Sequence, residues 1–512
     1  MRTGTKLAAI LGSLVLISVA TATVLRSGER APPAHPNVLF VVWDTVRADR
    51  LSIYGHDKPT TPFLEEIAPR SAVWDNAISP SFWTLPSHAS LFTGLSVSAH
   101  GTHADYKWLD GRFLTLAEHF SGQGYATYAW SSNPNINRNS NTIQGFDTFH
   151  QAFGQNRWRA AVEAFTKGLI HPEDETTRPN PDRHQVISYH KSGPVIHDAF
   201  TGWLDERPPD APFFAFLNYM EAHTYRLPTE EARRAIMTDP ASYHRALKTS
   251  NQLRRQTNVM FGRWRRYFRH ERQALFDLYD ASIVDLDRYL RGLFQALEDR
   301  DLLDDTIVVL TADHGEQFGE HGLYLHNYSL YQPLVHVPLV IHYPRAVPAG
   351  RIHQQVSTAG LFHTLVGLTG TEPPQQPILT TDLLHPGDDP VVSELNVPCG
   401  NPERRRLDLS VRDWTASYRA VVHDGLKLIW SSNGAHELYD LVADPREHRD
   451  LFGSGARDAE AQALLTALET WRREQPTFEV SDEERAAEAA ARLAEQDDDL
   501  AEQLEALGYV ED

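Results

Sequence analysis

Five short apolar runs, at residues 37–43, 125–130, 212–219, 306–311 and 337–343, have the length and composition of buried strands. Their apolar residues are continuous rather than alternating, which is typical of parallel strands covered on both faces. Helical patterns separate several of them. In the longest, residues 271–300, leucine and isoleucine recur at roughly helical spacing. Strands that alternate with helices predict an α/β fold: a doubly wound, mostly parallel sheet with helices on both faces.

The pattern changes after Pro386. Three short strand-like segments at residues 418–423, 426–431 and 436–441 predict a small antiparallel sheet near the C-terminus. Further on, Ser481 and Glu484 have the spacing of a capping box that opens an Ala/Glu-rich helix.

These patterns divide the chain into parts. We expect an N-terminal signal peptide or membrane anchor at 1–30, a main α/β domain at 37–385, a C-terminal subdomain at 386–475 and an acidic helical tail at 476–512. The stretches 156–189 and 229–269 look like helical or irregular insertions, where a substrate pocket would be shaped.

The N-terminus carries an export signal. Arg2 and Lys6 precede an uncharged, mostly apolar run of 19 residues at 7–25, close to the length that spans a bilayer. Ala20-Thr21-Ala22 offers a small-x-small cleavage site, so both a cleaved signal peptide and a retained anchor remain open. We therefore expect a periplasmic, extracellular or outward-facing membrane-anchored protein.

Composition and charge exclude several classes. Hydrophobic residues at 41% and charged residues at 23% describe an ordinary globular chain rather than a disordered or polytopic membrane protein. The formal charge of −20 argues against a nucleic-acid binder. Residues 482–512 contribute −10 of it, whereas residues 245–272 hold nine Arg or Lys against one Glu and form a solvated face or a basic rim. The single cysteine, Cys399, excludes an intrachain disulfide.

Candidate chemistry gathers just past the predicted strands. Asp44 closes one of them and the pair Asp313-His314 follows another. Functional residues of such sheets collect at the carboxyl ends of the strands, so these three are expected to hold one divalent cation with oxygen and nitrogen ligands. Ca²⁺, Mg²⁺, Mn²⁺ and Zn²⁺ all remain open. Glu221 and Glu316 are further candidates for binding the metal ion or supporting its ligands, but an ordinary structural role is favoured for both.

Thr84 begins the segment Thr-Leu-Pro-Ser-His, in which Pro86 suits the first turn of a helix running to about Phe92. A hydroxyl at a helix N-terminus meets unpaired N–H groups and the positive end of the helix dipole. Thr at such a place is usually only a cap. Beside a cation held by Asp44, Asp313 and His314, it is instead a candidate nucleophile and a fourth ligand.

The chain resembles the sulfatase family of the alkaline-phosphatase-like superfamily from about residue 37 to 451. The resemblance rests on ordered segments: NVLFVVWDTVRADRLSIYG (37–55), WTLPSHASLFTG (83–94), GFDTF (145–149), MEAHTYRLP (220–228), YDASIVDLDRYLRGL (279–293), DTIVVLTADHGEQFGEHG (305–322), LYQPLVHVPLVI (330–341) and ELYDLVADPREHRDL (437–451). The ending LEALGYV (504–510) also looks like the tails of bacterial members.

The resemblance implies roles for individual residues. Asp44, Asp313 and His314 match the metal ligands of the family, whereas Thr45 stands where many members have a second acid. His223 matches a histidine that contacts the ester. His326 falls where many sulfatases carry a substrate-binding lysine.

Two residues in the segment of the candidate nucleophile differ from the sulfatase pattern. Thr84 stands where sulfatases carry the Cys or Ser that is oxidised to formylglycine, and His88 replaces an arginine of the same motif, where it is expected to orient Thr84. His321, in a Gly-Glu-His-Gly turn, is expected to act as a supporting partner or a leaving-group acid. His336, His342 and His363 are expected to be structural.

Thr84 changes the expected chemistry, because threonine carries a methyl group on Cβ and cannot yield the aldehyde hydrate of sulfatases. Superfamily members with threonine here resemble phosphodiesterases and phosphoryl-group transferases. We therefore expect an exported, metal-dependent enzyme that hydrolyses phosphate mono- or diesters or transfers a phosphoryl group. Its expected substrate is an anionic ester, for which lipid-linked and glycan-linked forms both remain open. Two alternatives remain: a sulfuric ester hydrolase that uses Thr84 without formylglycine, and a catalytically silent binding module.

Overall fold

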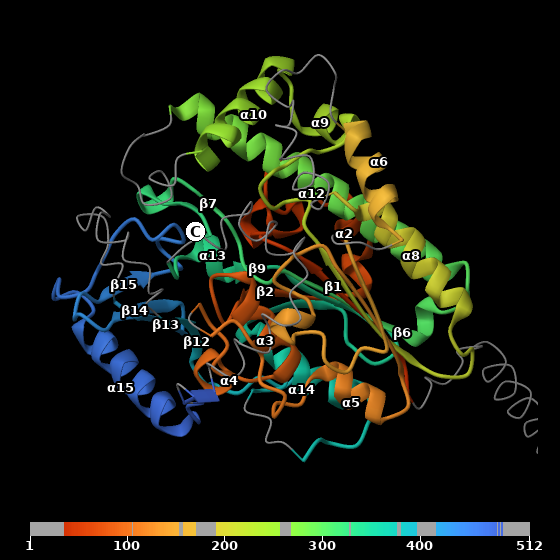
Figure 1. Ribbon diagram of the computed structural model, residues 1–512. Helices are drawn as coiled ribbons and strands as arrows, with labels where there is room; N and C mark the ends of the chain where they lie inside the picture. The colour runs from red at the N-terminus through yellow and green to blue at the C-terminus, as the bar shows by residue number, and fades with distance from the viewer. Residues whose placement is uncertain are drawn as a thin grey trace, which may run out of the picture. The chain divides into compact units, whose positions relative to one another are not determined.

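The computed structural model describes residues 35–104, 106–152, 157–169, 191–255, 268–326, 329–375, 380–396, 416–478, 480–481 and 483–484 (Figure 1). The expected N-terminal signal or anchor, Cys399 and most of the acidic tail lie outside these residues, as do parts of both insertions. The described parts of the insertions form α6 (Arg159–Leu169), α9 (Glu230–Ile236) and α10 (Pro240–Arg255).

The main sheet has nine strands in the order β11-β2-β10-β6-β1-β5-β3-β4, with β9 paired to β2 at one side. Its strands are β1 (Asn37–Trp43), β2 (Ala72–Ile78), β3 (Ala126–Ser131), β4 (Thr148–Gln151), β5 (Phe213–Tyr219), β6 (Thr306–Thr311), β9 (His336–Val337), β10 (Leu339–His342) and β11 (Gly350–Ser357). The pairs β1–β5, β1–β6, β3–β5, β3–β4 and β2–β11 are parallel, and the pairs that involve β9 and β10 are antiparallel. The mostly parallel α/β sheet predicted from the sequence is confirmed.

Strand β5 shows why helices cover both faces of this sheet, since successive side chains of a strand point to opposite sides. Phe213 packs against Phe200 of α8 (Gly193–Glu206), with ring centroids 6.2 Å apart. Its neighbour Phe214 meets Phe120 of α5 (Leu116–Gly122) on the other face, at 5.0 Å. Phe216, on the same face as Phe214, lies 5.8 Å from the ring of His88. Every residue of β5 is buried.

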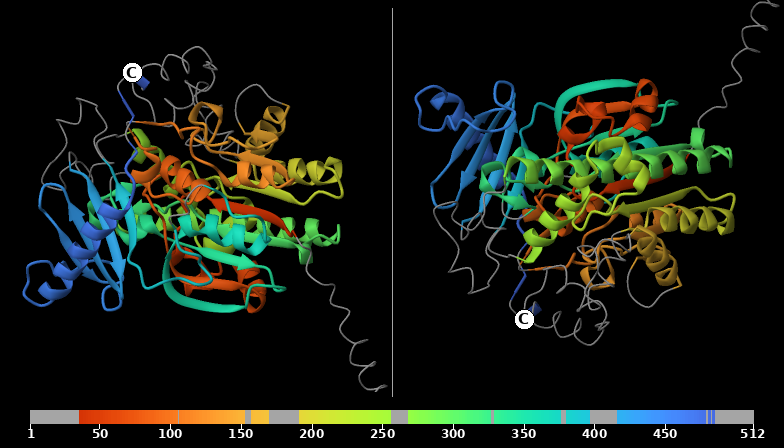
Figure 2. Two further views of the ribbon diagram at one scale, coloured as in Figure 1. Left: turned by 90° about the horizontal axis from the view of Figure 1, so that it is seen from below. Right: turned by 90° about the horizontal axis from the view of Figure 1, so that it is seen from above.

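The long helix α12 (Arg269–Glu298) lies on the same face as α8, and Figures 1 and 2 show the two side by side. The opposite face is covered by α3 (Thr84–Thr93), α5 and α14 (Leu361–Thr369). The sequence predicted α12 to within two residues. Helix α3 begins at Thr84, as expected, and ends one residue beyond the predicted Phe92.

The predicted C-terminal antiparallel sheet is also confirmed and has a fourth strand. It consists of β12 (Val391–Leu395), β13 (Tyr418–His423), β14 (Leu426–Ser431) and β15 (Glu437–Asp440), with α15 (Asp458–Glu474) packed on it. The hydroxyl of Ser393 donates to the carbonyl of Ser79, 2.6 Å away, and so ties this sheet to the main one. The predicted capping box of Ser481 and Glu484 is present.

Candidate active site at the carboxyl edge of the sheet

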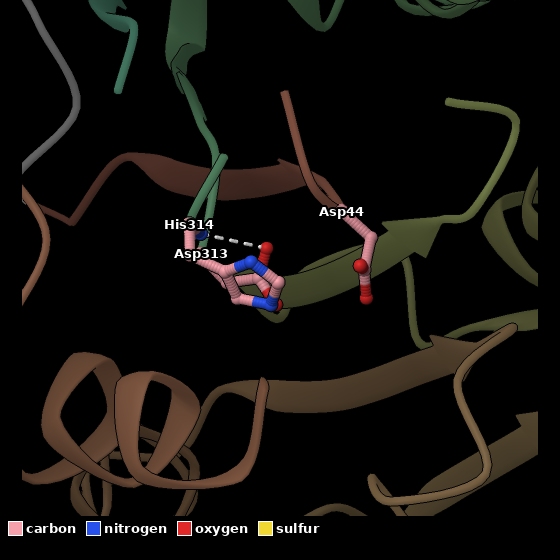
Figure 3. A group of neighbouring side chains, drawn as sticks. All are labelled: Asp44, Asp313 and His314. Carbon is pink, nitrogen blue, oxygen red and sulfur yellow. Dashed lines mark hydrogen bonds and ion pairs between the residues drawn. The ribbon is translucent and has the colours of Figure 1, made fainter. Parts of the chain in front are cut away.

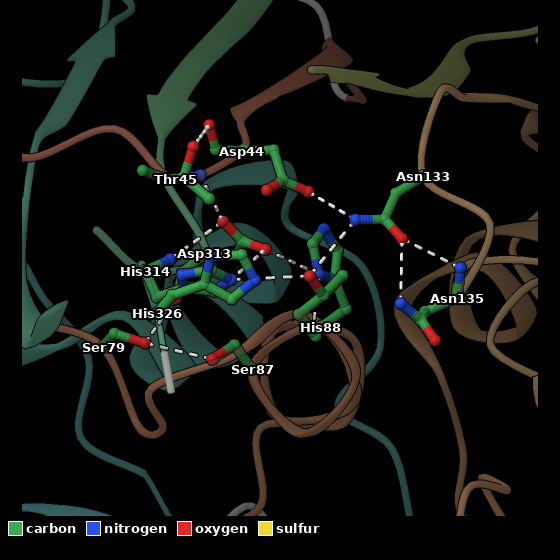
Figure 4. Close-up of polar contacts among 12 residues, drawn as sticks. Asp44, Thr45, Ser79, Ser87, His88, Asn133, Asn135, Asp313, His314 and His326 are labelled. Atoms are coloured by element: carbon green, nitrogen blue, oxygen red, sulfur yellow. Dashed lines mark hydrogen bonds and ion pairs between the residues drawn. The ribbon is translucent and has the colours of Figure 1, made fainter. Parts of the chain in front are cut away.

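Four neighbouring parallel strands end at one edge of the main sheet, because β3, β5, β1 and β6 are in register there. Asp44 follows β1, Asn133 comes two residues after β3, and Asp313 and His314 follow β6. All four side chains are fully buried. The sheet therefore gathers residues far apart in the sequence into one cluster (Figure 4).

Asp44, Asp313 and His314 each offer a ligand atom, and these atoms all lie within 4.8 Å of one another (Figure 3). Oδ1 of Asp313 accepts the backbone N–H groups of Thr45 and His314, at 3.1 and 2.9 Å. Among the described residues its Oδ2 has no hydrogen-bond partner, and neither has Oδ1 of Asp44. Nδ1 of His314 donates to the carbonyl of Gly315, so Nε2 carries a lone pair that can bind a cation and lies 3.4 Å from Oδ2 of Asp313.

The electrostatics of this group favour a bound cation. Burial, with repulsion from Asp313, raises the pKa of Asp44 to about 7. Burial also raises the pKa of Asp313 to about 7 and lowers that of His314 to about 4, so its imidazole is neutral. Unpartnered carboxylate oxygens in a buried site are costly unless they meet a cation. The three residues thus fit a divalent metal ion with oxygen and nitrogen ligands.

Thr45 does not replace the acid found in many sulfatases. Its backbone has a positive φ of 61°, and its hydroxyl donates to the carbonyl of Asp44 at 2.7 Å. Its contribution is the backbone N–H that holds Oδ1 of Asp313.

Thr84 is the first residue of α3, and its hydroxyl faces the cluster. The N-cap of the helix is Trp83, which makes no side-chain cap bond, so Thr84 is not the cap of its helix. Its Oγ1 lies 3.2 Å from Nδ2 of Asn133 and 3.4 Å from Nε2 of His314. This is the position that a nucleophile beside the cation site requires.

His88 lies one turn further along α3, and its Nδ1 donates to the carbonyl of Thr84 at 2.8 Å rather than to the hydroxyl. Nδ1 is also 3.6 Å from Oδ2 of Asp313. Burial lowers the pKa of His88 to about 3, so the ring is neutral. His88 thus contacts the backbone of the first turn of α3, while the Thr84 hydroxyl is held by other residues.

His326 and His223 form the other side of the site. The ring of His326 lies 4.8 Å from that of His314 and 5.0 Å from that of His223, measured between centroids. Nδ1 of His326 contacts Oε1 of Glu316 at 2.8 Å. Burial alone would lower the pKa of His326, but the carboxylates of Glu316, Asp44 and Asp313 together outweigh it and raise that pKa. Nδ1 of His223 donates to the carbonyl of Thr224 at 2.6 Å.

His321 is placed differently. Its ring stacks on Tyr331 at 3.6 Å and lies 6.4 Å from Tyr439 of β15. Its buried Nε2 has no hydrogen-bond partner among the described residues, and burial lowers its pKa to about 4. The described contacts link His321 to these tyrosines and not to Thr84.

Asn133 was missed by the sequence analysis. Its Nδ2 donates both to Oδ2 of Asp44, at 2.7 Å, and to Oγ1 of Thr84, at 3.2 Å (Figure 4). Its Oδ1 accepts from the backbone N–H of Asn135 at 2.8 Å, which fixes the orientation of the amide. The signal was available, because Asn133 follows the apolar run at 125–130 much as Asp44 follows β1.

The family model described as Sulfatase matches residues 36–371, the part of the chain that contains this cluster. The chain belongs to the sulfatase family. Its sequence is 23% identical over 432 residues to an ulvan-active sulfatase of Formosa agariphila, covering 82% of this chain and 78% of that protein. It is 21% identical over 507 residues to an N-acetylglucosamine-6-O-sulfatase of Bacteroides thetaiotaomicron, covering 85% of this chain and 86% of that protein.

Solved structures share the fold of this sulfatase-family protein. The phosphonate monoester hydrolase of Agrobacterium radiobacter superposes with a TM-score of 0.66 at 20% identity, covering 88% of this chain and 98% of that one. The same fold therefore occurs in proteins named for sulfate esters and for phosphonate esters.

Two other acids of the sulfatase-family chain have supporting contacts. Oε1 of Glu221 accepts the backbone N–H groups of Ser192 and Gly193 at the start of α8, at 3.2 and 3.0 Å. Glu316 pairs with Arg226 as well as with His326. The three histidines expected to be structural make hydrogen bonds remote from Thr84: His336 with the carbonyl of Asp75, His342 with Ser71 and His363 with the carbonyl of Thr380.

Proposed function

We propose that this sulfatase-family hydrolase acts on phosphorus esters through Thr84 and depends on a divalent metal ion. The observation that carries the proposal is the Thr84 hydroxyl, buried at the first residue of α3 and within 3.4 Å of both Asn133 and His314. A metal ion held by Asp44, Asp313 and His314 would lower the pKa of that hydroxyl and neutralise charge on the bound ester.

Side chains of this protein carry out the remaining steps of the reaction. The Thr84 hydroxyl loses its proton to solvent water, and Asn133 donates a hydrogen bond that stabilises the resulting alkoxide. Thr84 Oγ1 then attacks phosphorus in line, and the bond from phosphorus to the leaving oxygen breaks. His326, whose pKa the Glu316 carboxylate raises, donates a proton to the departing alkoxide. His223, beside it, binds a non-bridging oxygen. Water or an acceptor alcohol then attacks phosphorus in the phosphothreonine, takes the phosphoryl group and regenerates Thr84.

Phosphorus is favoured over sulfur because of the β-methyl group of Thr84. Formylglycine arises from a residue with two hydrogens on Cβ, and threonine has one. An ester formed on Thr84 must therefore be cleaved by attack on phosphorus or sulfur and not by collapse of an aldehyde hydrate.

Sulfate ester hydrolysis is the second candidate, favoured by the names of the relatives. Both curated relatives described above are sulfatases of glycans, which also suggests a glycan-linked ester as the substrate. In this case Thr84 would attack sulfur directly.

The test compares 4-nitrophenyl phosphate, bis(4-nitrophenyl) phosphate and 4-nitrophenyl sulfate with the full chain, Thr84→Ser and Thr84→Ala. We expect phosphorus esters to be turned over, Thr84→Ser to retain part of the activity, and Thr84→Ala to lose at least about 10³-fold in kcat. Mass spectrometry of the quenched enzyme should detect phosphothreonine at Thr84. Turnover of the sulfate alone would establish the second candidate, and a metal-free protein inert toward every ester would favour a silent module.

We also propose that the protein is exported. Arg2, Lys6 and the apolar run at 7–25 support this proposal. Among the described residues no helix is both long and apolar enough to cross a membrane. N-terminal sequencing of the mature protein after cell fractionation tests it. An intact N-terminus in the cytosolic fraction would contradict export, whereas an intact N-terminus in the membrane fraction would identify an anchor.

A further inference from the structure

The buried lysines and arginines among the described residues each lie near a carboxylate. The described residues include four buried lysines and arginines: Arg47, Lys191, Arg226 and Lys427. Arg47 pairs with Asp49 and Glu320, and Lys427 pairs with Glu447 in the C-terminal sheet. Lys191 donates to the carbonyl of Glu221, whose carboxylate is the charge that acts most strongly on it.

Arg226 is the buried arginine joined to the site through one intervening side chain. Its guanidinium pairs with Oε2 of Glu316, while Oε1 of the same carboxylate contacts His326. Nε of Arg226 donates to the carbonyl of Ala222 at 2.6 Å. The guanidinium lies 5.0 Å from the ring centroids of both Tyr279 and Phe318.

The Glu316 carboxylate therefore stands between this arginine and the histidines that face the ester. Glu316 neutralises the charge of Arg226 and keeps the Arg226 guanidinium paired, so that the guanidinium does not face a substrate anion. A phosphate monoester carries two negative charges at pH 8, whereas a phosphodiester and a sulfate ester each carry one. A protonated His326 and a metal ion at Asp44, Asp313 and His314 would act on both kinds of ester, so a second substrate charge would need a further unpaired cation.

We propose that Glu316 is a specificity-determining residue: by neutralising Arg226, it restricts the site to esters that carry a single negative charge. This inference rests on the proposed function and narrows it from phosphate esters in general to phosphodiesters over monoesters. Glu316 acts through Arg226 and His326 and does not itself touch the substrate.

The test compares 4-nitrophenyl phosphate with methyl 4-nitrophenyl phosphate. The second substrate carries a methyl group on one phosphate oxygen and therefore has one negative charge fewer. We expect the full chain to have the higher kcat/KM for the methyl diester at pH 8. The ratio of the two values should fall as the pH drops below about 6, where a phosphate monoester takes up its second proton. Titrations of the free enzyme affect both substrates and cancel in this ratio.

The variants separate charge from structure. Glu316→Gln removes the negative charge, and at about 8 Å in an effective dielectric of about 20 this favours one extra substrate charge by more than about tenfold. We expect the diester-to-monoester ratio to fall at least about tenfold, even if both rates fall because His326 loses its partner. Glu316→Asp keeps the charge and should keep the ratio. Glu394→Gln is the matched control, because Glu394 is a buried carboxylate paired with Arg419 in the C-terminal sheet.

Each outcome decides. Equal or faster turnover of the monoester at pH 8, or an unchanged ratio in Glu316→Gln, overturns the inference while leaving the phosphorus chemistry intact. Turnover of 4-nitrophenyl sulfate without either phosphate ester overturns the proposed function but supports the single-charge preference. If no ester reacts, calorimetric binding of the two phosphate esters to Thr84→Ala measures the charge preference directly, and equal or tighter binding of the monoester overturns it.

Discussion

The amide nitrogen of Asn133 lies 3.2 Å from Oγ1 of Thr84, and the same nitrogen lies 2.7 Å from a carboxylate oxygen of Asp44. One amide therefore connects the candidate nucleophile to the cation site. Because its carbonyl oxygen is held by Asn135, the amide cannot turn over without losing a bond. Asn133 thus keeps the hydroxyl of Thr84 directed at the cluster before any ester binds.

We predict that Asn133→Ala lowers kcat by about 10²-fold or more with little change in KM, since it removes the hydrogen bond that positions the Thr84 oxygen and stabilises its alkoxide before attack. Asn133→Asp should be at least as damaging, because it places a carboxylate against Asp44 and Thr84. Asn135→Ala is the graded control: the backbone N–H of residue 135 still holds Oδ1 of Asn133, so the loss should be smaller. Steady-state kinetics check the order, and an Asn135 variant worse than Asn133→Ala would contradict it.

A second prediction concerns the proton donor. If His326 protonates the leaving group, His326→Ala should slow an alkyl ester, which has a poor leaving group, by about 10²- to 10⁴-fold. The same variant should slow a 4-nitrophenyl ester far less, because nitrophenolate leaves without help. His321→Ala should change neither rate by more than a few-fold, since His321 stacks on Tyr331. Equal losses for both esters in His326→Ala would show that this histidine binds the substrate but is not the acid.

Much of the site could be predicted because its residues follow continuous apolar strands. Asp44 stands directly beyond such a run, Asp313 one residue further and His314 two residues further, and in a parallel sheet the ends of these runs meet. Strands β2 and β11 escaped prediction because their sequences are polar in part. Strand β11, GRIHQQVS, is largely exposed, so no apolar pattern marks it.

Side-chain partners were less predictable than strand ends. The sequence indicated that Thr84 starts a helix. It did not indicate that Trp83 is the N-cap, so that the Thr84 hydroxyl is not used to cap the helix. The resemblance to sulfatases assigns His326 to a substrate-binding position, whereas His321 is expected to be a supporting partner or a leaving-group acid. The fold separates them, because the positive φ of 53° at His321 belongs to a turn that directs its ring to Tyr331.

A third prediction concerns pH and stability. Burial raises the pKa of Asp287, on α12, to about 7, although its carboxylate accepts the backbone N–H groups of Phe63 and Leu64. In the unfolded chain the same group ionises near pH 4. The folded state therefore binds the proton more tightly, and this contribution to stability is present at low pH and lost as the pH rises toward 7.

Asp287→Asn lacks this titration. We predict that the free energy of unfolding of Asp287→Asn, relative to the unaltered chain, rises by up to about 3 kcal/mol between pH 5 and pH 7. Denaturant unfolding of both proteins at several pH values measures the difference. A constant difference across that range would mean that Asp287 ionises normally in the folded protein.

The fourth prediction concerns metal removal. Asp44 and Asp313 are fully buried, and each has a carboxylate oxygen without a hydrogen-bond partner, so a bound cation should stabilise the folded protein. Chelation should abolish turnover and lower the melting temperature. A ligand at 100 times its Kd stabilises a folded protein by about 2.7 kcal/mol, which is measurable in a domain of this size.

Asp313→Asn tests whether the stabilising cation binds at this site, because the substitution should remove metal binding without disturbing the fold. Asn keeps an oxygen for the N–H groups of Thr45 and His314, so the variant should fold, but it should no longer gain stability from added metal. Asp388→Asn is the control, because Asp388 belongs to the exposed group with His423 and Asp424. We expect its response to metal to match that of the unaltered chain. If Asp313→Asn is still stabilised by metal and Asp388→Asn is not, the cation binds at the exposed group and Thr84 must be activated by other means.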